Sequence, residues 1–138
     1  MKIMPRVRVR TPLNPTESPA KVKVALLNLF PDLVFVEEGH ELVGEAASLD
    51  HLRKLIRNQR IRDTARSVLL RGRRGSAMRF TLSKQPAYVG RVNFGGATGP
   101  LGDIDVSVED EDLDALIDHV AESTVGRRLT LLDRSEGT

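Results

Sequence analysis

Three segments of the chain alternate apolar and polar residues with a period of two, the pattern of strands that bury one face. They cover residues 6–10, 78–82 and 104–108, with Val9, Phe80 and Val106 on their apolar sides. A strand of this kind needs a second layer against that side, and helix-period stripes elsewhere in the chain supply one. We therefore expect an α+β fold, a single-domain sandwich of a mostly antiparallel sheet with helices packed on one face.

The other elements are predicted from apolar stripes and from the residues that begin and end them. A helix is expected from a cap at Thr16 to about residue 29, followed by a hairpin of strands over 33–36 and 41–46. A further strand is predicted over 89–94, before the glycine-rich loop 95–102. A last helix follows a cap at Asp110, and a short closing strand is expected over 129–132.

The segment from 49 to about 70 carries two apolar faces that one straight helix could not bury together. Leu52 and Ile56 share one face, while Ala65 and Leu69 share another that begins at Ile61, which at 100° per residue points away from Leu52. We therefore predict two helices with a break over 58–60. Ser48 is expected to cap the first, and Gly72 or Gly75 to end the second.

Length and composition set the class of protein. A chain of 138 residues is typical of one domain, which we assign to 1–138 with a flexible tail over about 127–138. It contains no cysteine, which fits a reducing compartment, and its apolar runs are too short to cross a bilayer. The expected localisation is cytoplasmic, with no membrane contact.

Charge is distributed very unevenly along the chain. Residues 52–79 contain ten basic side chains and one acid, Asp63, whereas residues 103–122 contain nine acids and no lysine or arginine. Nine of the ten basic residues are arginine, whose planar guanidinium binds phosphate through two hydrogen bonds and stacks on bases. This pattern predicts a polarised surface that binds RNA. The alternative is a solvated face, or arginines paired with the acidic segment of the same chain.

The predicted RNA-binding residues lie in the two basic helices, the loop 72–75 and the segment after the next strand. The expected phosphate contacts are Arg57, Arg60, Arg62, Arg66, Arg71, Arg73, Arg74, Lys84 and Arg91. Gln85, Tyr88 and Asn93 are predicted to contact base or ribose. Because Tyr88 is the only tyrosine and the phenylalanines fall at core positions, we expect recognition of backbone and shape rather than base sequence.

The stretch LRKLIRNQRIRDTARSVLLRGRRG, followed by FTLSKQPAYVGRVNF and preceded by NPTESPAKVKVALLNLFPD, resembles an archaeal family of uncharacterised proteins predicted to bind RNA. The likeness covers the chain from Val7 to about Val120. It implies a fold like that of ribosomal protein L five, and a partner among RNA, exosome and ribosomal proteins. At residue 86 the family has a small residue, whereas this chain has Pro86. The family's motif corresponds to Gln59, Arg60, Asp63, Thr64, Ala65, Arg66, Leu70, Gly72, Lys84, Gln85, Gly90, Val92, Asn93 and Phe94.

Enzymatic chemistry is weakly indicated. The three histidines are scattered, no nucleophile motif is present, and no cofactor or metal is expected, so we predict a protein that is not an enzyme. One alternative is a magnesium-dependent nuclease using Asp103 and Asp105, helped by Glu109 or Asp110. Another is an adaptor that docks on an acidic protein of an RNA-processing or ribosomal complex. Exposed strand edges would also allow a homodimer.

Overall fold

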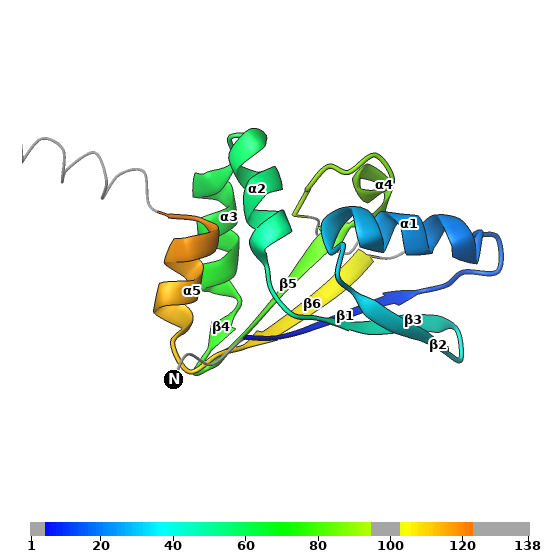
Figure 1. Cartoon of the computed structure of the whole chain (residues 1–138), viewed down its shortest axis with the longest axis horizontal. Helices are drawn as coiled ribbons and strands as arrows, with labels where there is room; N and C mark the ends of the chain where they lie inside the picture. The colour runs from blue at the N-terminus through cyan, green and yellow to red at the C-terminus, as the bar shows by residue number, and fades with distance from the viewer. Residues whose placement is uncertain (1–4, 95–102, 123–138) are drawn as a thin grey trace, which may run out of the picture.

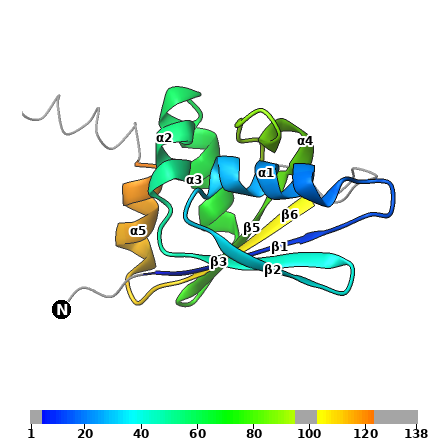
Figure 2. The same ribbon diagram turned by 45° about the vertical axis from the view of Figure 1, so that its right-hand side comes forward.

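The computed structural model describes residues 5–94 and 103–122, within which six strands form one antiparallel sheet in the order β2-β3-β1-β6-β5-β4. The helices lie on one face of this sheet (Figures 1 and 2). The predicted α+β architecture is therefore confirmed. In chain order the elements are β1 (Arg6–Pro12), α1 (Pro19–Leu29), β2 (Val34–Glu38), β3 (Glu41–Ala46), α2 (Asp50–Asn58), α3 (Arg62–Arg71), β4 (Arg73–Arg74), β5 (Ala77–Ser83), α4 (Lys84–Ala87), β6 (Asp103–Glu109) and α5 (Leu113–Val120).

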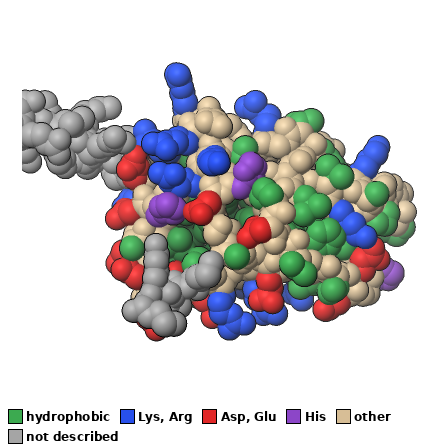
Figure 3. All heavy atoms as spheres, viewed as in Figure 1, with side chains coloured by type: hydrophobic (Ala, Val, Ile, Leu, Met, Phe, Trp, Pro, Cys, Tyr) green, Lys and Arg blue, Asp and Glu red, His purple; other side chains and the backbone are tan. Residues whose placement is uncertain are grey.

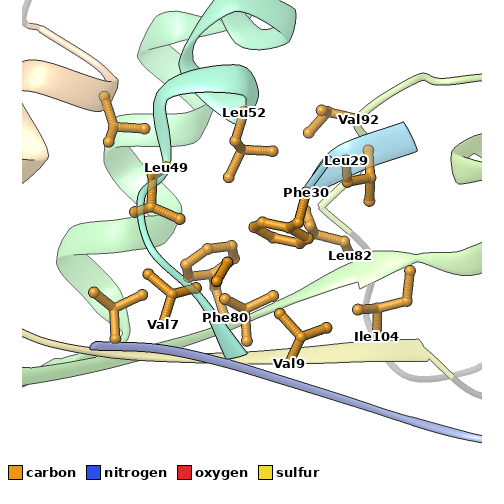
Figure 4. Close-up of a cluster of buried hydrophobic side chains, with 14 of the residues drawn as sticks. Val7, Val9, Leu29, Phe30, Leu49, Leu52, Phe80, Leu82, Val92 and Ile104 are labelled. Carbon is orange, nitrogen blue, oxygen red and sulfur yellow. The ribbon is translucent and has the colours of Figure 1, made fainter. Parts of the chain in front are cut away.

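The core lies between the sheet and the helices. Val9 of β1 stands opposite Val106 of β6, which in turn stands opposite Phe80 of β5, so the apolar side chains of neighbouring strands face the same way. Leu52 of α2 and Phe30 close this layer from the helical side (Figure 4). All three segments of alternating sequence form strands, because the period of two places every apolar residue on the covered face.

Three helix starts differ from prediction by one or two residues. Ser18, not Thr16, caps α1 by accepting a hydrogen bond from the Lys21 amide at 3.4 Å, and Pro19 follows as the first helical residue. Asp112, not Asp110, caps α5 through the Ala115 amide. Leu49 occupies the cap position of α2, while the Ser48 hydroxyl accepts from the Asp50 amide. In each case the residue predicted as the cap precedes the actual cap position by one or two residues.

The predicted break between the two basic helices is confirmed. α2 ends at Asn58 and α3 begins at Arg62, with Arg60 in the left-handed region at φ 59°. This turn lets Ile56 and Ala65 both reach the core. α3 ends at Gly72, one of the two predicted terminators.

The prediction of a strand over 89–94 is wrong. After β5 the chain forms the short helix α4, with Pro86 in the first turn where no intrahelical amide bond is lost, and turns again at Gly90, φ 73°. Backbone turns and side chains from other elements satisfy most of this segment, although the Ser83 amide of β5 donates to the Asn93 carbonyl. Asn28 of α1 donates to the carbonyls of Ala87 and Tyr88 at 2.9 and 3.1 Å.

The predicted glycine-rich loop 95–102, closing strand 129–132 and tail 127–138 lie outside the described residues. Among the residues that are described, no helix is long and apolar enough to span a membrane.

Candidate nucleic-acid interface

A ladder of three ion pairs joins α3 to α5. Arg62 donates to Glu122 at 2.7 Å, Arg66 donates to Asp118 at 2.6 Å, and Arg73, just after α3, pairs with Asp114. Arg66 also donates to the carbonyl of Ala121 at 3.2 Å. We call these six charged side chains the α3–α5 ladder: Arg62, Arg66, Arg73, Asp114, Asp118 and Glu122.

The ladder follows from helical spacing on both sides. At 100° per residue Arg62 and Arg66 point within about 40° of each other, and the acids of the ladder recur every four residues, two of them on α5 and Glu122 just after it. Carboxylates of the same chain therefore relieve the repulsion among Arg62, Arg66 and Arg73. A phosphate that approaches these guanidinium groups meets a positive charge that a carboxylate already neutralises.

The other five arginines predicted to contact phosphate point to solvent. They are exposed, and within the described residues none lies at ion-pair distance from a carboxylate. Figure 3 shows basic side chains gathered over α2 and α3, next to acidic side chains over α5. We call this set the exposed arginines: Arg57, Arg60, Arg71, Arg74 and Arg91.

The exposed arginines fall at the two ends of α3. Arg57 and Arg60 lie at the α2–α3 turn, whereas Arg71 closes α3 and the Arg74 guanidinium donates to the Arg71 carbonyl at 3.1 Å. Ten residues at 1.5 Å each separate the two ends by about 15 Å. Phosphates of one RNA strand or one duplex can therefore contact both ends.

Gln59 holds the segment with Arg91 against the α2–α3 turn. Its side-chain amide donates to the Val92 carbonyl at 2.9 Å, and its carbonyl oxygen accepts from the Val92 amide at 2.7 Å. Val92 is buried, and its neighbours Arg91 and Asn93 are exposed. We call this pair of bonds the Gln59 clamp. Sequence reasoning placed Gln59 only within the resemblance motif and did not assign it this role.

Lys84 is placed in the interior rather than on the surface. It is 2% exposed, and its ammonium donates to Glu17 at 3.0 Å and to the Pro12 carbonyl at 2.8 Å. It therefore has no part in the surface proposed below. No local pattern pointed to Glu17, which lies 67 positions from Lys84.

Glu17 is the centre of a buried polar cluster. Burial raises the pKa of its carboxyl, but hydrogen bonds from Asn14 and the hydrogen bond and charge of Lys84 outweigh burial, so the pKa lies below its ordinary value. The Tyr88 hydroxyl donates to Glu17 at 3.4 Å, and burial together with the Glu17 charge raises the pKa of Tyr88. Tyr88 is half-buried against the core, which limits its ring as a stacking surface.

The remaining predicted contacts are exposed. Gln85 lies on α4 and Asn93 follows Val92, where its carbonyl accepts from the Ser83 amide at 2.7 Å. Both side chains face solvent on the same segment as Arg91.

The acids considered for a nuclease lie on the uncovered face of the sheet. Asp105 stands between Arg10 of β1 and Thr81 of β5, and one oxygen of Asp103 is buried without a hydrogen-bond partner. Within 5–94 and 103–122, no group of three or more histidines, aspartates and glutamates is placed to hold a metal ion.

Comparisons with known proteins agree on one family. A family model described as RNA binding matches residues 6–110. The chain is 41% identical to a UPF0201 protein of Methanocaldococcus jannaschii, over 87% of this chain and 74% of that protein. It is 39% identical to a UPF0200/UPF0201 protein of Archaeoglobus fulgidus over 93% of this chain, but it spans only 41% of that relative's length.

Solved structures agree with the sequence matches. The crystal structure of an uncharacterised UPF0201 protein superposes with a TM-score of 0.80 at 39% identity, covering 86% of this chain and 94% of the other. The crystal structure of a UPF0201 protein from Methanococcus jannaschii gives a TM-score of 0.78 at 37% identity, with the same coverage of both chains.

Proposed function

Since this chain belongs to the UPF0201 family of uncharacterised archaeal proteins, whose family model is described as RNA binding, we propose that it binds RNA through backbone phosphates. The exposed arginines carry this proposal. Their guanidinium groups face solvent without a carboxylate nearby in the described chain, whereas the arginines of the ladder already hold one. Guanidinium groups matched to phosphate by shape and charge are the usual means of contacting an RNA backbone.

The arrangement favours shape and backbone over base sequence. Phe30 and Phe80 are buried, and Phe35 is packed against the core, so these rings offer no stacking platform. Arginines at both ends of α3 suit a structured or looped RNA whose phosphates span about 15 Å. The fold likeness to ribosomal protein L five and the exosome link implied by the resemblance remain parts of this proposal.

A salt series with the pure protein and a short hairpin RNA tests the proposal. One variant combines Arg57→Gln, Arg60→Asn and Arg91→Gln, with asparagine chosen because it tolerates the left-handed backbone at residue 60. The control combines Arg6→Gln, Arg8→Gln and Lys21→Gln, which removes the same charge from exposed positions elsewhere. We expect the first variant alone to lose about 2 to 3 units of slope of log affinity against log salt.

Either of two results would count against phosphate binding at these arginines. Equal losses in the two variants would mean that only net charge matters. Absence of binding by the folded parent at low salt would favour an adaptor that docks on an acidic protein, and a pull-down with RNA-processing or ribosomal proteins would then be the next experiment.

No catalytic step is part of the proposal. The same RNA incubated with magnesium should therefore remain intact. Cleavage that requires magnesium and disappears in Asp105→Asn would replace this proposal with the nuclease alternative.

A further inference from the structure

The sheet edge beyond β4 opens into a hollow of about 770 Å³ beside the last turn of α3. β4 pairs with only Met78 and Ala77 of β5, so from Phe80 to Leu82 no strand of the described chain covers this edge. The volume lies within the range of about 300–1,000 Å³ typical of small-molecule sites. The residues around the hollow that matter below are Arg71, Arg74, Arg79, Phe80, Phe94 and Asp105.

Gly72 fixes the shape of this hollow. Its carbonyl accepts from the Arg79 amide at 3.0 Å, and a Cβ at residue 72 would lie 1.9 Å from the Arg79 carbonyl oxygen. Only glycine therefore allows the end of α3 to approach β5 this closely. This contact brings Arg71, Arg74 and Arg79, from three different elements, around one space.

The lining combines positive charge with an apolar wall. The lining contains three arginines and one carboxylate, that of Asp105, so it is cationic overall. Arg71 and Arg74 each donate to nearby backbone carbonyls, yet a guanidinium has five N–H groups and most of theirs make no hydrogen bond within the described chain. Phe80 is buried, and half-buried Phe94 meets it edge to face with ring centres 6.0 Å apart.

A nucleotide is a ligand that can contact both the arginines and the apolar wall of this hollow. Its phosphate suits guanidinium groups, and its base suits an aromatic edge or face, whereas a bare phosphate would leave the apolar wall unused. We propose that the hollow receives one unpaired nucleotide of bound RNA, with the phosphate on Arg71, Arg74 and Arg79 and the base against Phe94. This inference rests on the proposed function and adds to it a site for a single nucleotide.

NMR titration of the full chain locates the site. The probes are adenosine 5′-monophosphate, adenosine and inorganic phosphate, each followed through backbone amide shifts. We expect the monophosphate to shift the amides of Arg71, Gly72, Arg79 and Phe94 at lower concentration than either fragment does. If the monophosphate shifts no amide around the hollow, or inorganic phosphate binds there equally well, the inference is wrong.

A ring substitution tests the base contact within RNA. Phe94→Leu keeps an apolar side chain against Phe80 but removes the aromatic surface. It should weaken binding of a hairpin with an unpaired loop by about 5- to 150-fold, the range for loss of one base stack, and leave binding of a blunt duplex unchanged. Arg8→Gln, on an exposed residue of β1 outside the hollow, is the control and should weaken both RNAs equally and slightly.

The outcomes separate this inference from the proposed function. If the protein binds hairpin and duplex with the expected salt slope, but Phe94→Leu affects both alike, phosphate binding stands and the nucleotide site is wrong. If no RNA binds at low salt while the monophosphate still occupies the hollow, the RNA proposal fails and the nucleotide site stands alone.

Discussion

The Gln59 clamp shows how one side chain can replace a strand. Val92 is buried, so its amide and carbonyl need hydrogen-bond partners, and no strand supplies them in the segment after α4. The Gln59 side chain supplies both partners from the turn between the basic helices. The placement of Arg91 and Asn93 therefore depends on Gln59.

Removal of the clamp should cost stability. Gln59→Ala leaves two buried backbone groups unpaired, and we expect a loss of about 2 kcal/mol or more in the free energy of unfolding. Urea denaturation measures the loss, and amide exchange at Val92 should accelerate. Gln85→Ala, on an exposed glutamine, is the matched control, with an expected change within about 0.5 kcal/mol. Equal stability of the two variants would contradict a structural role for the clamp.

The Glu17–Lys84 pair predicts how stability depends on pH. Because the pKa of Glu17 is lowered on folding, its contribution is complete above the unfolded value of about 4.5 and is lost as pH falls through the lower folded pKa. Glu17→Gln leaves the Lys84 ammonium buried without its carboxylate. We expect this change to destabilise the protein by about 3–5 kcal/mol at pH 6, with a smaller deficit near pH 3.

Urea unfolding at both pH values measures this effect. Glu45→Gln changes an exposed carboxylate and should differ little from the parent at either pH. A second change, Lys84→Met in the Glu17→Gln background, should recover part of the loss by removing the unpaired charge. A deficit that is the same at pH 3 and pH 6 would show that Glu17 contributes by packing rather than by charge.

At the scale of elements, acids on α5 and just after it form ion pairs with three arginines that the sequence predicted for RNA. Asp114 and Asp118 stand one helical turn apart on α5 and pair with Arg73 and Arg66, and Glu122 just after the helix pairs with Arg62. α5 therefore competes with any polyanion that approaches α3, and the ladder lowers the number of phosphates the surface can bind.

Release of two ladder arginines should strengthen RNA binding. Asp118→Asn with Glu122→Gln removes two carboxylates from Arg66 and Arg62, and we expect several-fold tighter binding with a salt slope steeper by about 1 to 2. The pairs are partly exposed, so stability should fall by no more than about 1 kcal/mol for each. Glu38→Gln with Glu45→Gln makes the same change in net charge on β2 and β3. If that control tightens binding as much, the effect is one of net charge and not of the ladder.

At the scale of the whole molecule, charge is arranged differently from the pattern along the chain. The sequence predicted a polarised surface, but α5 lies against α3, and part of the acidic segment neutralises part of the basic one. Among the arginines predicted for RNA, those without a carboxylate partner in the described chain lie at the two ends of α3. The proposed binding is therefore confined to the helical side and to the edge at β4 and β5. The bare face over β1 and β3, where Arg8 stands opposite Glu45, is not needed for it.

The sequence alone determined the elements that depend on local physics. Alternation at 6–10, 78–82 and 104–108 specified strands, and the opposed faces of Leu52 and Ile61 specified the break before α3, because side-chain direction follows directly from backbone period. The strand over 89–94 was predicted wrongly because the conformation of this segment depends on contacts that are not local in the sequence. Within this segment the backbone of Val92 is satisfied by the side chain of Gln59, 33 positions away, and the Arg91 amide by the Pro86 carbonyl of the preceding turn.

Only the tertiary structure decided which charges are available. Arg66 is 52 residues from Asp118, and Lys84 is 67 from Glu17. Pairs this far apart form because the sheet order and the packing of α3 against α5 bring them together. The local apolar period of the sequence does not predict that packing. The sequence therefore determined that arginines would be concentrated in α2 and α3. The fold decided which of them hold a carboxylate and which face solvent.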